Sequence, residues 1–135
     1  MAKLVLTNVI TTIGGVDYSA NINQVELNLS ADSVETTAFG SQWRTEVSGL
    51  KSGTFTVAFH NDYAAAAIDG SLWALFGTQA TVVVKPAGTA VSASNPSYSF
   101  LANVNNLTPI SGSVGDLATQ NVTWPISGEV TRATA

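Results

Sequence analysis

The side chains suited to catalysis are few and scattered along the chain. His60 is the only histidine, and with Asp62 and a serine it would supply the three groups of a hydrolase triad. His60 falls, however, on the polar side of an alternating segment, and the sequence has no Gly-x-Ser-x-Gly turn that would expose a nucleophile. We therefore interpret His60 as a surface or interface residue and expect a protein that is not an enzyme.

The acidic residues have neither a catalytic nor a metal-binding spacing. Asp32 and Glu35 are close in sequence, but glycoside chemistry needs two carboxylates that face each other across a cleft. The sequence has no calcium loop of the Asp-x-Asp-x-Asp-Gly type and no cysteine that would bind zinc or form a disulfide. Residues 112–116 lack the lysine of a phosphate-binding loop. We expect no cofactor, no metal and no small-molecule ligand.

Charged residues are scarce. They make up 10% of the 135 residues, whereas an ordinary soluble domain carries about 25%. Apolar residues account for 45%, and serine and threonine together number thirty, so hydroxyl groups and apolar side chains must cover most of the surface. The length predicts a single domain that spans residues 1–135.

The charge balance and the apolar runs exclude several partners. Five Lys and Arg residues within a net charge of −4 cannot neutralise many phosphates, so we expect no specific binding to nucleic acid. The apolar runs are far shorter than the roughly 18 to 20 residues of a membrane helix, so we expect no membrane partner. The first eight residues lack the apolar region of a secretion signal, which indicates synthesis in a cytoplasm.

Alternation of apolar and polar residues dominates the chain and predicts half-buried strands. The apolar residues of one face are Val25, Leu27 and Leu29 in segment 22–30, and Phe55, Val57 and Phe59 in segment 53–60. Further strands are predicted at 3–12, 16–19, 81–85, 97–105, 117–124 and 129–132. Seven or eight short strands predict a mainly β fold, a two-sheet antiparallel β-sandwich or barrel.

One segment has the composition of a helix. Residues 61–76 contain four consecutive alanines, the best helix formers; Asn61 or Asp62 would cap the start, and Gly77 follows the end. We expect one flanking α-helix, which residues 69–71 would divide into two pieces. Trp73 lies within it, and we place this side chain in the core.

Residues 31–48 have no clean periodicity, and they predict a long inter-strand loop. Their apolar side chains need a surface to pack against, which another chain would provide. Trp43 of this loop and Trp124 are candidate interface anchors, because tryptophan is enriched at binding hot spots. A surface with few charges and many strand edges indicates self-assembly, since lysine and proline normally protect such edges in monomers.

The order of these motifs resembles a known family. Residues 34–55, VETTAFGSQWRTEVSGLKSGTF, look like a segment of the major tail tube proteins of long-tailed, siphovirus-like bacteriophages. The strand and helix that follow, and the closing segment GDLATQNVTWPISG at 115–128, are also similar. The resemblance covers the chain from about residue 22 to its end.

The resemblance implies two packed antiparallel sheets with one helix, and six subunits in a ring that lend strands to a continuous inner barrel. Stacked rings would form the tail tube of a virion, made in the host cytoplasm, with other tail proteins as partners and with DNA passing through the lumen unbound. Residues 31–48 would be an arm to a neighbouring subunit or ring, loose in the free subunit. The candidate interface residues are Val34, Phe39, Trp43, Arg44 and Val47.

The charge of the chain agrees with a conduit for DNA. Six copies at −4 each give −24 per ring, and an acidic or neutral bore repels phosphates. Glu26, on the polar face of a predicted strand, is a candidate lumen-facing residue; a solvent-facing position on an outer sheet is the alternative.

Two other classes stay open. One is a capsid decoration or head–tail joining protein, which would coat capsids or form a single ring. The other is a β-sandwich carbohydrate-binding module, in which Trp43 or Trp124 would be the sugar platform. For the tail tube hypothesis, we expect that deletion of residues 31–48 leaves a folded monomer that cannot polymerise.

Overall fold

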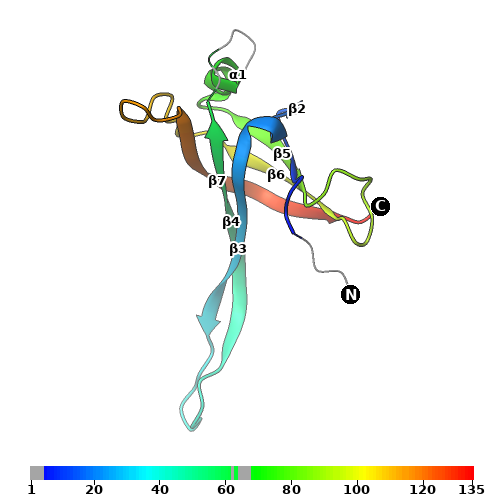
Figure 1. Ribbon diagram of the computed structural model, residues 1–135. Helices are drawn as coiled ribbons and strands as arrows, with labels where there is room; N and C mark the ends of the chain where they lie inside the picture. Colours follow the sequence, from blue (N-terminus) through cyan, green and yellow to red (C-terminus); the bar gives the residue numbers. More distant parts are fainter. Residues whose placement is uncertain (1–4, 62, 64–67) are drawn as a thin grey trace.

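The computed structural model describes residues 5–61, 63 and 68–135 (Figure 1). Its strands follow the hydrogen-bonded order β2-β1-β5-β6-β7-β4-β3, and all neighbouring pairs are antiparallel. The elements are β1 (Ile10–Ile13), β2 (Val16–Asp17), a 3₁₀ turn (Ser19–Asn21), β3 (Ile22–Glu35), β4 (Glu46–His60), α1 (Ile68–Leu75), β5 (Gln79–Lys85), β6 (Ser97–Asn103) and β7 (Thr119–Ala133). The predicted mainly β, antiparallel fold is confirmed: the strands form one seven-stranded sheet, and the described residues contain one α-helix.

Strand β7 joins the two parts of the sheet because it changes partner along its length. Residues 119–125 pair with β4, and residues 126–133 pair with β6. Phe55 of β4 and Phe100 of β6 are not on neighbouring strands, yet their ring centroids lie 5.3 Å apart. The two parts of the sheet therefore face each other across a shared core, an arrangement compatible with the predicted sandwich.

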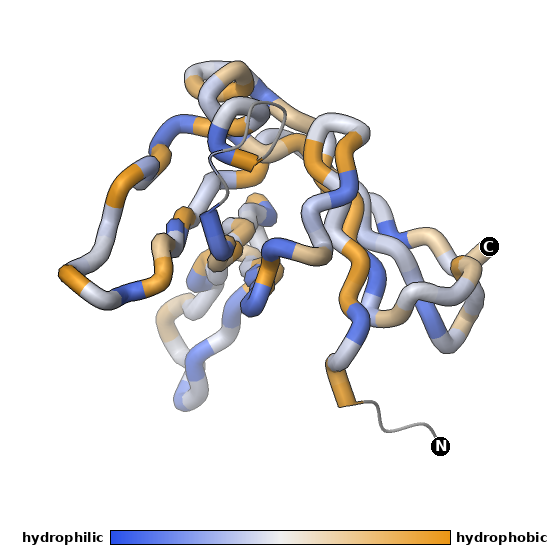
Figure 2. Tube along the Cα trace, turned by 45° about the horizontal axis from the view of Figure 1, so that its top comes forward, coloured by the Kyte–Doolittle hydropathy of each residue, from blue (hydrophilic) through white to orange (hydrophobic). Residues whose placement is uncertain are grey.

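The core is built from the apolar side of the alternating strands, and the alternation is visible along the chain in Figure 2. Phe55, Val57 and Phe59 are completely buried, as predicted from their spacing. They belong to one buried cluster with Ile13, Val82, Phe100, Ala102, Val104, Val122 and Trp124. Val25 and Leu27 of β3 are half-buried on the same side and pack against this cluster.

The outer halves of β3 and β4 leave the body as a two-stranded arm (Figure 1). This corrects the predicted long loop at 31–48, because its two ends are paired strands and only residues 36–45 lie between them. Every side chain from residue 28 to residue 52 is exposed. Neither face of the arm packs on the body, so the sequence there has no alternation of buried and exposed positions from which strands are recognised.

Helix α1 is shorter than predicted, and its predicted start and part of its alanine run lie outside the described residues. It continues through residues 69–71 without the predicted division. Ile68 and Leu72 on either side of them are buried and fix this turn against the core. Gly77 ends the helix as predicted, with φ of +84°, a conformation that favours glycine.

Two predicted strand boundaries are corrected as well. The predicted strand 3–12 is reduced to β1, and its first two residues lie outside the described residues. The predicted strands 117–124 and 129–132 form one strand, β7, that runs through Pro125. Pro125 stands where β7 changes partner: it is opposite Thr54 at the end of the pairing with β4, and Ile126 begins the pairing with β6.

We expect glycine-to-alanine substitutions at two positions to change the unfolding free energy in opposite directions. The Cβ of a Gly53→Ala variant would lie 2.6 Å from Leu29 Cδ2 and 2.9 Å from the Asn28 carbonyl oxygen, so we expect a loss of about 1 to 3 kcal/mol in unfolding free energy. At Gly70, within α1, a Cβ meets no described atom within 4 Å, and Gly70→Ala should gain about 1 kcal/mol. Urea denaturation of both variants checks the two signs; a neutral Gly53→Ala would contradict the packing at the base of the arm.

Candidate assembly surfaces

The described residues hold no cluster of three metal-ligating side chains. His60, at the end of β4, is half-buried rather than on the open surface, and its Nδ1 has no hydrogen-bond partner among them. The described helix is too short to cross a membrane.

The pKa of the Asp17 carboxyl is lowered by a local turn. The Ser19 hydroxyl donates a hydrogen bond to Asp17 Oδ1, and the Ser19 backbone N–H donates another at 2.9 Å. Ser19 Oγ in turn accepts the Thr11 backbone N–H at 2.9 Å. These bonds fix the turn after β2 to β1, which is a structural role for the carboxylate.

The tip of the arm, residues 36–45, presents large apolar side chains to solvent. Phe39 is fully exposed and Trp43 is 83% exposed. Val34 and Val47 are opposite each other in the β3–β4 register and lie on one face of the arm below the tip. The structure thus brings the apolar members of the candidate interface set onto one projecting element.

Hydrogen bonds within the arm close its tip. The Thr36 backbone N–H donates to the Thr45 carbonyl at 2.8 Å, and the Thr45 N–H donates to Thr37 Oγ1 at 2.9 Å. Gly40, with φ of +92°, makes the turn. The side chain of Arg44 is 84% exposed and lies 3.4 Å from Glu35, so it is paired within the arm. The arm is therefore held together by contacts within its own chain.

Strands β3, β4 and β7 bury one side in the core, and their other side forms a polar face. The cross-strand rows are Gln24–Ala58–Asn121, Glu26–Thr56–Thr123 and Asn28–Thr54–Pro125. Thr56 Oγ1 and Thr123 Oγ1 lie 3.0 Å apart in one hydrogen bond. Glu26 is exposed, and it is the one ionisable side chain in segments 24–30, 52–58 and 121–125. We call these three rows the polar face.

The burial of two tryptophans is the reverse of what was predicted. Trp124, predicted as an interface anchor, is completely buried beside Phe55, and its Nε1 donates to the Asn106 carbonyl at 3.0 Å. Trp73, predicted in the core, is 64% exposed and stacks on Phe76 with 6.1 Å between centroids. Leu72 carries the buried side of α1, and the next residue points about 100° away from it.

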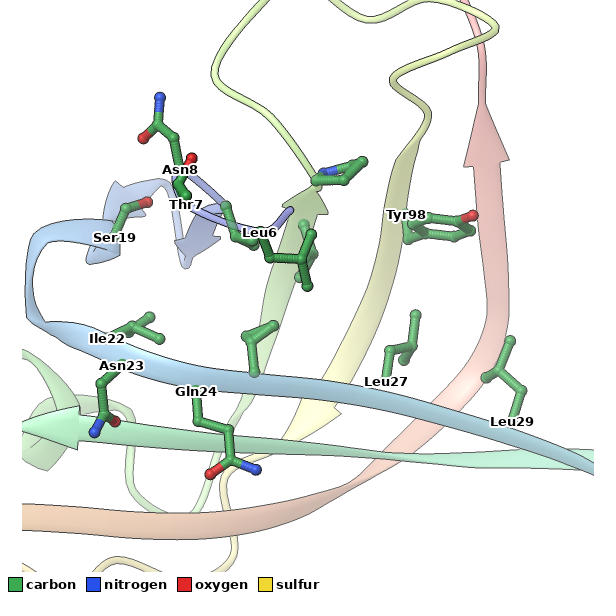
Figure 3. Close-up of a pocket in the computed structure, with 14 residues that line it drawn as sticks. Leu6, Thr7, Asn8, Ser19, Ile22, Asn23, Gln24, Leu27, Leu29 and Tyr98 are labelled. Atoms are coloured by element: carbon green, nitrogen blue, oxygen red, sulfur yellow. The ribbon is translucent and has the colours of Figure 1, made fainter. Parts of the chain in front are cut away.

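An open groove lies between the inner face of β3 and the N-terminal segment (Figure 3). Its volume is about 810 Å³. Leu27 and Leu29 project into it from β3, with Tyr98 of β6 and Leu6 on the other sides, while Asn23 and Gln24 point away (Figure 3). The groove was not predicted, because the sequence gives no sign that residues 6–9 lie beside β3.

No protein-family model and no curated protein sequence matches the chain. Solved structures do. A chain in the virion of a native gene transfer agent (GTA) particle is similar at a TM-score of 0.75 and 15% identity, covering 93% of this chain and 95% of that one. A chain in the tail of an empty GTA particle with C6 symmetry gives 0.69 and 17%, covering 95% of both. A chain in the PVC sheath/tube terminator of an extracellular contractile injection system gives 0.74 and 16%, covering 98% and 97%.

These similarities extend over nearly the whole chain and confirm the fold that the resemblance to tail tube proteins implies. The chain shares its fold with components of phage-tail-like particles. One of these particles is contractile, so the fold is not confined to the long-tailed, siphovirus-like class of the sequence resemblance.

Proposed function

We propose that this protein is a structural subunit of a phage-like tail tube, which assembles into hexameric rings that stack to form the conduit for DNA delivery. The observation that carries the proposal is the projecting arm, whose apolar tip has no covering surface in the described part of its own chain. Monomeric proteins rarely leave such a group uncovered, since exposed apolar patches mark interaction sites. The shared fold with a chain from a C6-symmetric GTA tail agrees with it.

In this proposal the arm makes the contacts between subunits. Val34, Phe39, Trp43, Arg44 and Val47 lie on it, and all five are exposed in the single chain. Burying the apolar side chains in a neighbouring subunit or ring would favour assembly by about 25 cal/mol for each Å² removed from water. Other tail proteins would bind the ends of the tube, and the protein would reside in the virion tail after synthesis in the host cytoplasm.

The polar face suits a channel through which DNA slides. Its hydroxyl and amide groups are uncharged, and Glu26 would place a ring of carboxylates toward the lumen. Such a lining has no cations to replace the counterions of the phosphates, so it would not bind the DNA backbone. We propose Glu26 as lumen-facing for this reason.

The two alternatives stand differently against the structure. A carbohydrate-binding module would use an exposed tryptophan platform, and the burial of Trp124 leaves Trp43 as the remaining one of its two candidates. A capsid decoration or head–tail joining protein agrees with the same exposed arm and differs in the assembly it forms, a capsid coat or a single ring.

Sedimentation velocity over a series of rising concentrations separates these functions. The tail tube proposal predicts a shift from monomer to heavy polymers of no fixed size. Arrest at one discrete ring would favour the joining protein, and a monomer at every concentration would contradict the proposed function. Quenching of tryptophan fluorescence by sugars would support the carbohydrate-binding module instead.

A further inference from the structure

The groove beside β3 is apolar and carries no formal charge. Val25, Leu27 and Leu29 form one wall, and Val84, Pro86 and Tyr98 form the opposite one. The segment at residues 6–9, Ser19 and Ile22 complete the lining, and Asn23 and Gln24 border it with side chains that point away (Figure 3). None of these residues is Asp, Glu, Lys or Arg. A volume of about 810 Å³ lies within the range of roughly 300 to 1,000 Å³ for pockets that enclose mostly apolar ligands.

The arm tip has matching chemistry. Residues 36–43 are Thr-Thr-Ala-Phe-Gly-Ser-Gln-Trp, without a charge. Arg44 beside them is neutralised by Glu35 at 3.4 Å. Phe39 and Trp43 stand free in solvent, whereas aromatic side chains of this size normally end in a desolvated pocket when they act as anchors. The groove lining and residues 36–43 of the tip are thus an apolar cavity and an apolar knob, and neither contains a formal charge.

We propose that the groove receives the arm tip of a second copy of this chain, an inference that rests on the proposed function. A tip cannot enter its own groove. The groove ends at Leu29, and six further residues of paired β3 carry the chain outward to Glu35, about 20 Å at the usual strand rise. The hairpin ladder is continuous over this distance apart from one bulge, so folding it back would break its hydrogen bonds.

The contact has a definite symmetry. Each copy offers one knob and one groove at different places, so the interface is head-to-tail and not a two-fold pairing of identical patches. Contacts of this kind close into rings or continue as helical polymers. The groove therefore gives the arm a receiving site on the next subunit, and the tip fills space that a single copy leaves to solvent.

Photocrosslinking from the tip tests where it binds. The chain has no cysteine, so Ser41→Cys provides one attachment point for a benzophenone maleimide and leaves Phe39 and Trp43 in place. A small share of labelled chain is polymerised with an excess of ¹⁵N-labelled wild-type chain, irradiated, and analysed by mass spectrometry. The proposal predicts crosslinks to ¹⁵N peptides containing residues 6–9, 22–29 or 84–98. The same label at Thr54→Cys, on the polar face, should not reach these peptides.

The crosslinking experiment can contradict the groove proposal without contradicting the proposed function. Polymers whose tip crosslinks map to the polar face, α1 or the loop before β7 would overturn the groove proposal and leave the proposed function standing. Failure of the unlabelled wild-type chain to polymerise would instead overturn the proposed function.

A charge placed in the groove gives a second test. Leu29→Glu should raise the concentration needed for polymerisation about tenfold or more, because the tip would have to desolvate an unpaired carboxylate. Leu29 is 52% exposed, so the monomer should keep its thermal midpoint. Leu101→Glu is the matched control, at a 40% exposed leucine on β6 that does not line the groove, and it should polymerise as wild type. Equal behaviour of the two variants would contradict the proposal.

Discussion

Removal of the arm should abolish polymerisation and leave the body folded. In this variant, an Asn-Gly turn replaces residues 31–51 and joins Ser30 to Ser52, which are opposite each other in the β3–β4 register. Asn-Gly supplies the tight turn that closes a two-residue hairpin. No side chain removed by the excision is buried, so we expect the thermal unfolding midpoint to move by only a few degrees. Sedimentation should show a monomer at every concentration.

A double variant with the full arm separates the tip from the strands. Phe39→Ser with Trp43→Ser keeps the β3–β4 ladder and removes the exposed aromatic side chains. We expect this protein to remain largely monomeric as well. If the variant without the arm forms tubes, the arm is not needed for polymerisation. If only the double variant forms tubes, the strands of the arm, and not its aromatic tip, make the contacts between subunits.

Truncation of Trp124 should cost far more stability than truncation of Trp73. Trp124 is completely buried, lies beside the Phe55 ring and donates a hydrogen bond to the Asn106 carbonyl. Because Trp124→Ala removes all of these contacts, it should lower the unfolding free energy by about 3 to 5 kcal/mol. Trp73 is mostly in solvent, and Trp73→Ala should change it by no more than about 0.5 kcal/mol. Guanidinium denaturation of both monomers measures the difference.

The two variants also test the placement of the core. A large loss from Trp73→Ala with a small one from Trp124→Ala would restore the assignment that the sequence predicts and contradict the packing of β7 on β4. Fluorescence gives an independent reading, since Trp124 should be shielded from a polar quencher and Trp73 should not.

The strands of the body could be predicted because one of their faces is buried. Phe55, Val57 and Phe59 alternate with polar residues, and the structure buries all three. The arm could not be recognised as strand because both of its faces meet solvent, so no burial imposes a period of two on residues 31–48. Strand β7 was predicted as two strands, 117–124 and 129–132, although the structure pairs it without a break, with β4 up to Pro125 and with β6 from Ile126.

The candidate interface residues were predictable only in part. Phe39 and Trp43 were identified because large apolar side chains outside a periodic segment need a partner surface. The burial of Trp73 was predicted wrongly because residue spacing alone does not fix the orientation of a short helix. Leu72 faces the core, so Trp73, the next residue, cannot. The groove depends on residues 6–9 lying beside β3, a contact between segments whose pairing no local pattern encodes.

Cryo-electron microscopy of the concentrated wild-type protein tests the central claim most directly. We expect hollow polymers of stacked rings with sixfold symmetry, in which the polar face with Glu26 lines the channel and each arm contacts another copy. Isolated monomers, or polymers without a continuous channel, would contradict the assignment of this chain to a tail tube.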